Sequence, residues 1–80
     1  MNEAQIQQDL TDIFREVFDD LALMVERATT AADIQGWDSA RMIDLIIGAE
    51  ERFDVRFTTR ETDGLKCVGD FIDLIARKKA

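Results

Sequence analysis

The chain has 80 residues, of which 46% are hydrophobic, and a formal net charge of −7. A chain of this length forms one small domain, and so negative a charge argues against nucleic-acid binding, which depends on clusters of Lys and Arg. With no His, one cysteine (Cys67), no apolar run long enough to insert into a membrane and no signal peptide, the composition predicts a cytoplasmic protein that is not an enzyme and has no metal site.

The first segment, from Asn2 to about Phe18, repeats apolar residues at the spacing of one helical face. These residues are Ile6, Leu10, Ile13, Phe14, Val17 and Phe18. Asp9, Asp12, Arg15 and Glu16 fall on the other side of the same period. We therefore expect an amphipathic helix whose charged side faces solvent.

The connection from Asp19 to Asp38 is longer than most loops, and such loops are generally functional or pinned by their own side chains. The candidates for such pins are Leu23, Val25, Ile34 and Trp37. Gly36 is expected to adopt a backbone conformation that other residues resist. Trp37 is either a half-buried anchor, which the large area of its ring favours, or a contact for a substrate.

A second apolar period begins directly after this connection and predicts a helix from Ser39 to about Phe53. Its members are Met42, Leu45, Ile46, Ala49 and Phe53. Either Asp38 or Ser39 can serve as its N-cap, and taken alone a serine at this place is most simply a cap. A group on the Ser39 hydroxyl would lie where unpaired backbone N–H groups and the helix dipole favour a phosphate.

The last turn of the second helix carries Glu50 and Glu51, where the helix dipole disfavours negative charge. Residues placed against their local preference indicate a binding partner. The alternative is that both are solvated surface glutamates, which change stability little.

Beyond Phe53, the chain predicts one short element and one more helix. Val55 and Phe57 alternate with charged residues in a short extended piece, after which Thr58 or Thr59 can cap a helical turn across residues 60–64. Cys67 is expected to be a small residue at the start of the final helix, about residues 68–77. The apolar face of that helix consists of Val68, Phe71, Ile72 and Ile75.

These elements together resemble the acyl carrier protein family and its peptidyl and aryl carrier relatives. The family's core motif is Asp-Ser at the start of an apolar-patterned helix, followed by an acidic residue, an acidic pair and a Phe. The matching residues here are Asp38, Ser39, Asp44, Glu50, Glu51 and Phe53. The loop at residues 29–34 with Trp37, and the pattern of Val68, Ile72 and Ile75, extend the resemblance over nearly the whole chain.

The resemblance implies an all-α fold: a four-helix bundle with a short third helix, in one acyl carrier domain over residues 1–80. It also implies that 4′-phosphopantetheine is attached covalently to Ser39, which makes the chain a phosphoprotein, and that Asp38 belongs to the attachment motif. In the family, this aspartate helps to hold Mg²⁺ in the complex with the phosphopantetheinyl transferase. An apolar interior able to shelter an acyl chain would be lined by residues such as Met42, Leu45, Ile46, Phe53, Val68 and Ile72.

The same resemblance implies acyl-loading and acyl-transfer enzymes as partners of a monomeric shuttle. The residues expected to contact them are Arg41, Asp44, Glu50 and Glu51. The chain departs from the family pattern at Ala40, where Leu is usual, and at Arg41, where fatty-acid carriers often have an acidic residue. These departures favour a specialised, freestanding carrier in fatty-acid, polyketide or related secondary metabolism over the housekeeping fatty-acid carrier. The alternatives are a peptidyl or aryl carrier, or a helical interaction module that carries no prosthetic group.

Overall fold

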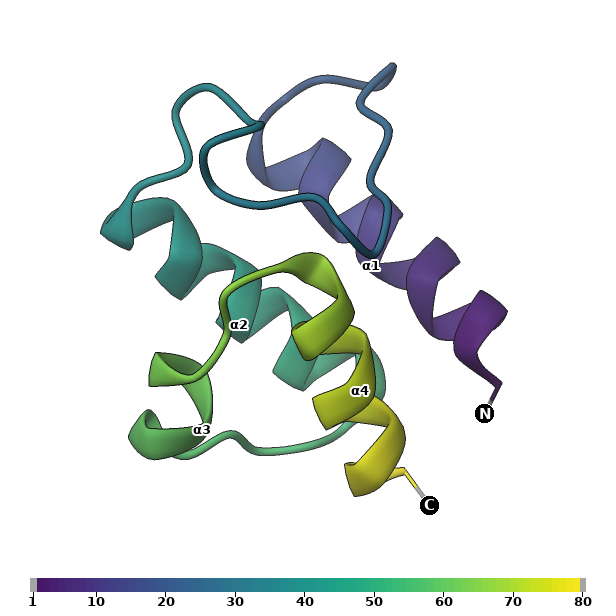
Figure 1. Cartoon of the computed structure of the whole chain (residues 1–80). Helices are drawn as coiled ribbons and strands as arrows, with labels where there is room; N and C mark the ends of the chain where they lie inside the picture. The colour runs from purple at the N-terminus through teal and green to yellow at the C-terminus, as the bar shows by residue number, and fades with distance from the viewer. Residues whose placement is uncertain (1, 80) are drawn as a thin grey trace.

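The computed structural model describes residues 2–79, which fold into four helices (Figure 1). They are α1 (Glu3–Val17), α2 (Ser39–Phe53), α3 (Thr59–Asp63) and α4 (Val68–Lys78). No strand occurs within residues 2–79. In Figure 1, α3 lies in the connection between α2 and α4, and the long loop after α1 crosses one end of the molecule. The prediction of an all-α four-helix bundle with a short third helix is confirmed.

Helix α1 forms where the apolar period predicts it. Its first turn is capped by Asn2, whose side chain accepts a hydrogen bond of 2.8 Å from the backbone N–H of Gln5. Its apolar face is buried against α2 and α4, the two helices with which it makes most of its contacts. The buried apolar residues of this face are Ile6, Leu10, Ile13 and Phe14.

The expectation that Asp9 faces solvent is wrong, since this residue is only 7% exposed. Arg52 of α2 covers it, and its Nη2 donates to Asp9 Oδ1 at 3.0 Å. Gln5 Nε2 donates to the same oxygen at 3.2 Å, and Arg52 also lies 3.4 Å from Asp12. A buried carboxylate needs such partners, because losing its hydration is costly. The charged side of α1 therefore helps to fix α2.

Helix α2 has the predicted bounds. Leu45, Ala49 and Phe53 are buried, whereas Met42 and Ile46, on the edges of the same face, are only partly buried. The helix ends at Asp54, whose backbone adopts the left-handed conformation (φ 54°) that stops helices.

Helix α3 begins one residue earlier than predicted. Thr58 is its N-cap, and it forms a reciprocal capping box with Glu61: the Glu61 N–H donates to the Thr58 hydroxyl, and the Thr58 N–H donates to the Glu61 carboxylate at 2.8 Å. Glu61 also pairs with Lys78 of α4 at 3.0 Å. These two partners join the short helix to the end of the chain.

The hydrogen bond from the Thr58 N–H, aided by Lys78, lowers the pKa of Glu61 below its usual value of 4.5. A lowered pKa stabilises the folded state at pH values above 4.5, and this contribution is lost as the pH falls through the folded-state pKa. We expect Glu61→Gln to reduce the melting temperature at neutral pH. The difference in melting temperature between wild type and Glu61→Gln should disappear at acidic pH, as measured by thermal unfolding from about pH 7 to pH 3. A gap independent of pH would show that the charge of Glu61 has no such role.

Helix α4 begins after Cys67, which contributes no side-chain cap. Its first N–H groups find partners in the long loop: Val68 donates to the Thr29 carbonyl at 2.9 Å, and Gly69 donates to the Arg27 carbonyl at 2.8 Å. A Cβ at Gly69 would lie 3.1 Å from that carbonyl oxygen, so glycine permits the close approach. The loop therefore replaces the missing cap.

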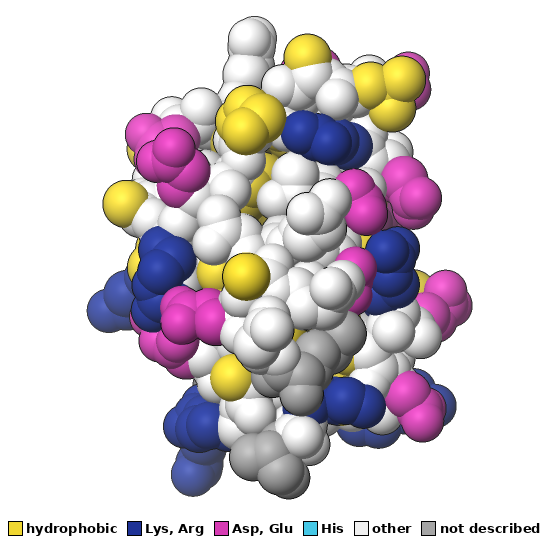
Figure 2. Space-filling view, turned by 90° about the vertical axis from the view of Figure 1, so that its right-hand side faces the viewer, with side chains coloured by type: hydrophobic (Ala, Val, Ile, Leu, Met, Phe, Trp, Pro, Cys, Tyr) yellow, Lys and Arg dark blue, Asp and Glu magenta, His cyan; other side chains and the backbone are white. Residues whose placement is uncertain are grey.

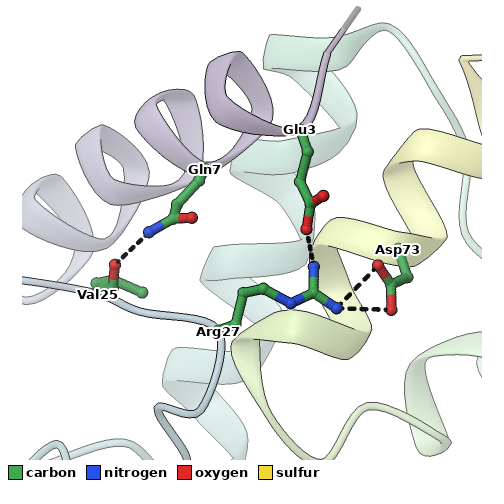
Figure 3. A network of polar contacts seen from close by, with 5 residues as sticks. All are labelled: Glu3, Gln7, Val25, Arg27 and Asp73. Atoms are coloured by element: carbon green, nitrogen blue, oxygen red, sulfur yellow. Dashed lines mark hydrogen bonds and ion pairs between the residues drawn. The ribbon is translucent and has the colours of Figure 1, made fainter.

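The long loop is also held by side chains (Figure 3). The guanidinium of Arg27 pairs with Glu3 at the start of α1 and with Asp73 of α4, the latter at 3.0 Å, and Gln7 Nε2 donates to the Val25 carbonyl at 3.1 Å. The hydrogen bond to Asp73 raises the pKa of Arg27 above the ordinary value of an arginine, which is already high. The guanidinium therefore stays charged. The predicted apolar pins are confirmed: Val25 and Ile34 are buried, and Leu23 and Trp37 pack against the core.

The core combines residues from α1, α2, α4 and the long loop. Its largest fully buried side chains are Phe14, Phe53, Phe71, Ile6, Leu10, Leu45, Ile72, Ile75 and Val68. On the face shown in Figure 2, acidic and basic side chains are interspersed over the surface, with hydrophobic side chains among them. A partner that docked on that face would meet a mixed charge pattern.

Candidate functional site

The junction between the long loop and α2 settles which residue caps the helix. The backbone of Asp38 is extended (φ −122°, ψ −172°), and its carboxylate accepts a hydrogen bond of 2.9 Å from the N–H of Arg41. Asp38 is therefore the N-cap, and Ser39 is the first residue of α2. Because the cap is provided by its neighbour, Ser39 is not needed for capping.

Ser39 itself is exposed, and within residues 2–79 no hydrogen bond engages its hydroxyl. The hydroxyl lies at the positive end of a four-turn helix, close to backbone N–H groups that have no partner within the helix. This environment favours an anionic substituent. Ser39 is thus both accessible to a modifying enzyme and suited to a phosphate.

The segment before Ser39 is fixed by a turn and by aromatic packing. Gly36 has a φ of +88°, a conformation that residues with a side chain rarely adopt, and the N–H of Trp37 donates to the Ile34 carbonyl at 3.3 Å. The Trp37 ring packs edge-on against Phe14 of α1, with 5.2 Å between ring centroids and an interplanar angle of 83°. A second edge contact joins Trp37 to Phe18 at 6.4 Å. Trp37 is therefore a half-buried anchor that connects the site to the core.

Ser39 lies on the wall of a surface groove with a volume of about 330 Å³. The groove is formed by the long loop, the start of α2 and the connection between α3 and α4. Its lining residues are Ala31, Trp37, Asp38, Ser39, Met42, Leu65 and Lys66. The groove is shallow and largely open to solvent.

Sequence patterns did not indicate that Leu65 and Lys66 belong to the site, although they line the groove with Ser39. They lie 26 and 27 positions further along the chain, beyond α3, and no periodicity relates them to α2. Only the tertiary packing of the α3–α4 connection brings them there. Two other groove residues were expected near a ligand: Trp37 as an alternative substrate contact and Met42 as part of a shelter for an acyl chain.

The four residues predicted to contact partners all lie on α2, but in different settings. Arg41 forms an ion pair of 3.5 Å with Asp44, and both are about half exposed. Glu51 is exposed, whereas Glu50 is partly buried and accepts a hydrogen bond of 2.9 Å from the backbone N–H of Phe57. Glu50 therefore has a structural role inside the molecule that explains its place in the last turn.

The outward side of α2 also carries large apolar residues that the sequence analysis did not single out. Ile43 is 58% exposed and Ile47 is 48% exposed, four positions apart on one face of the helix. They follow Ser39 along the same side at the same spacing. The available signal was the position of Ile43 and Ile47 in series with Ser39, outside the apolar period of Leu45, Ala49 and Phe53.

The apolar residues expected to shelter an acyl chain divide into two groups. Leu45, Phe53, Val68 and Ile72 are buried in the core, and Met42 and Ile46 lie at its edge. Within residues 2–79, no cluster of three or more His, Cys, Asp or Glu side chains is arranged to hold a metal ion. None of the helices described is both long and apolar enough to cross a membrane.

Comparisons with known proteins agree with this arrangement. The chain is 33% identical to the acyl carrier protein of Acidothermus cellulolyticus, over 95% of this chain and 90% of that protein. It is 28% identical to the acyl carrier protein of Syntrophobacter fumaroxidans, over 100% of this chain and 99% of that protein. The solution structure of a holo acyl carrier protein from Geobacter metallireducens superposes with a TM-score of 0.86 at 40% identity, covering 92% of this chain and 85% of that one.

No family model matches the chain. The alignments with the two curated relatives cover nearly all of this chain and nearly all of each relative. The fold is shared with the Geobacter metallireducens structure. The chain therefore belongs to the acyl carrier protein family.

Proposed function

We propose that the chain carries an acyl group as a thioester on a 4′-phosphopantetheine arm attached to Ser39. The observation that supports this most directly is the exposed Ser39 hydroxyl, which begins α2 without capping it and lines a groove. The described residues fit the arm in charge and in shape: the helix N-terminus suits its phosphate, and the groove suits its partly apolar body. When bound, the arm supplies a terminal thiol that holds the acyl group.

The role of the protein in this function is presentation and recognition. Asp38 keeps α2 intact up to the residue that is modified, and Trp37 anchors the loop beside it. A tether raises the effective concentration of its cargo at each partner's active site. The partners are a phosphopantetheinyl transferase and the enzymes that load and remove acyl groups.

The outward side of α2 is the surface that we propose for these partners. It combines the exposed Ile43 and Ile47 with the flanking charges of Arg41, Asp44 and Glu51. Apolar residues surrounded by polar ones are typical of interaction sites. Glu50 contributes less directly, because its carboxylate already binds the Phe57 N–H. The carrier that we propose is a specialised one of fatty-acid, polyketide or related secondary metabolism, because Arg41 stands where fatty-acid carriers often have an acidic residue.

A mass measurement tests the function. The purified apoprotein is treated with a broad-specificity phosphopantetheinyl transferase, Mg²⁺ and either coenzyme A or an acyl-coenzyme A. We expect the intact mass to increase by one phosphopantetheine in the first case and by one acylated arm in the second. The acyl group should then be released by hydroxylamine, as for a thioester. An unchanged mass in both cases would favour an interaction module that carries no arm.

Two substitutions at Asp38 separate its capping role from its charge. Asp38→Ala should reduce the free energy of unfolding by about 0.5–2 kcal/mol, the usual cost of losing an N-cap. Asp38→Asn should retain nearly wild-type stability, because its amide oxygen can accept the same hydrogen bond from Arg41. We expect the Asn variant to be modified more slowly by the transferase, since it lacks the carboxylate. Equal modification rates for wild type and Asp38→Asn would exclude a role for the charge.

A further inference from the structure

Lys66 is the cationic residue on the wall of the groove that contains Ser39. Its backbone is fixed at the entrance of α4, where its N–H donates to the Asp70 carboxylate at 3.0 Å. Its side chain is exposed, and no ion pair within residues 2–79 involves it. The ammonium group of Lys66 is thus available to an anion that enters the groove.

Two other basic residues, Arg41 in the first turn of α2 and Lys78 at the end of α4, already have ion-pair partners. Arg41, two residues after Ser39, pairs with Asp44, and it lines a different depression on the far side of Asp38. Lys78 pairs with Glu61. Among these three basic residues, Lys66 is the one that lines the groove of Ser39 and has its charge uncompensated.

A phosphate on Ser39 would be stabilised by such a counter-charge in addition to the N-terminus of α2. The first 40 residues contain nine acidic and two basic side chains, and the carboxylate of Asp38 lies on the same groove wall. Additional negative charge there is opposed by Asp38 and favoured by the N-terminus of α2. A lysine side chain places a point charge at the end of a flexible stem, and this suits a phosphate whose exact position is not fixed in advance.

We propose that Lys66 positions the arm: its ammonium group pairs with the phosphodiester on Ser39 and directs the arm into the groove. There the dimethyl group that follows the phosphate packs against Leu65 and Met42, which line the groove with Trp37. The arm then lies along the α3–α4 connection and not along the exposed Ile43 and Ile47 side of α2. This inference rests on the proposed attachment of the arm to Ser39.

The test uses the modified protein and NMR, with no partner enzyme present. Intact mass first establishes that wild type and variants carry the arm. We then expect nuclear Overhauser contacts between the dimethyl group of the arm and the side chains of Leu65 and Met42. In Lys66→Met, the equilibrium constant for docking of the arm should fall by about 1.5- to 5-fold, the range for loss of one exposed ion pair. The contacts should weaken, and the phosphorus resonance should move towards that of free phosphopantetheine.

Two controls make the result specific. Lys79→Met removes the same charge from the end of α4, outside the groove, and should leave the contacts unchanged. Lys66→Arg keeps the positive charge and should keep the contacts between the arm and the groove. Identical contacts and phosphorus shifts in wild type and Lys66→Met would overturn the proposal, as would equal losses in Lys66→Met and Lys79→Met. Failure of the mass increase itself would instead contradict the attachment at Ser39.

Discussion

Ser39→Ala is expected to abolish modification completely while leaving the fold intact. The substitution removes the hydroxyl that would attack the pyrophosphate of coenzyme A, and no neighbouring residue can replace it. Since Asp38 provides the cap, and alanine is the best helix former, the free energy of unfolding should change by no more than about 0.5 kcal/mol. Circular dichroism with chemical denaturation measures stability, and intact mass after transferase treatment measures modification.

A matched control distinguishes the loss of the hydroxyl from a general disturbance of the site. Ala40→Ser places a hydroxyl one residue further along the same exposed helix start. In the double variant Ser39→Ala, Ala40→Ser, the hydroxyl is present but points about 100° away around the helix axis. We expect no mass increase for the double variant and a normal increase for Ala40→Ser alone. Modification of the double variant would show that the transferase does not require the position of Ser39.

Phe14→Ala is expected to have the largest effect on stability. Phe14 is fully buried, and it also provides the ring against which Trp37 packs at 5.2 Å. Removing a buried Phe side chain costs about 3–5 kcal/mol. A chain of 80 residues has a total stability of about 4–12 kcal/mol, so this variant should lose much or most of it. Urea denaturation, followed by circular dichroism, gives the change in the free energy of unfolding.

The effect of Phe14→Ala should extend to the site. With its ring partner gone, Trp37 should show a red-shifted fluorescence maximum in whatever fraction remains folded. Leu21→Ala is the control, because Leu21 is 86% exposed and its loss should change the free energy by at most about 0.5 kcal/mol. Comparable destabilisation of the two variants would contradict the description of the core.

Much of this fold could be predicted from the sequence, because α1 and α2 combine a clear apolar period with a capping residue at the start. The bounds of α2 agree with the prediction for that reason. The start of α3 was displaced by one residue, since either Thr58 or Thr59 could have capped it and only the capping box with Glu61 selects Thr58. Local patterns thus give an element and its approximate bounds, but choosing between adjacent caps requires the hydrogen bonds.

Features that depend on contacts between distant segments could not be predicted. Asp9 appeared to belong to a solvated face, but Arg52 lies 43 positions later and covers it. Arg27 fixes the long loop through Glu3 and Asp73, which lie 24 and 46 positions away. The same limitation applies to the candidate site: its motif singles out Ser39, whereas Leu65 and Lys66 reach the groove of Ser39 only through packing. Glu50, expected at a partner surface, has its hydrogen-bond partner seven residues away.

Locating the modification on the chain tests most directly whether Ser39 itself carries the arm. The wild-type protein would be modified with coenzyme A and the transferase, and then fragmented in the mass spectrometer. We predict that the added mass appears in every fragment that contains Ser39, and that the fragments on either side of it keep their unmodified masses. An added mass on any other residue, or no added mass with a transferase that modifies a known carrier in parallel, would contradict this account.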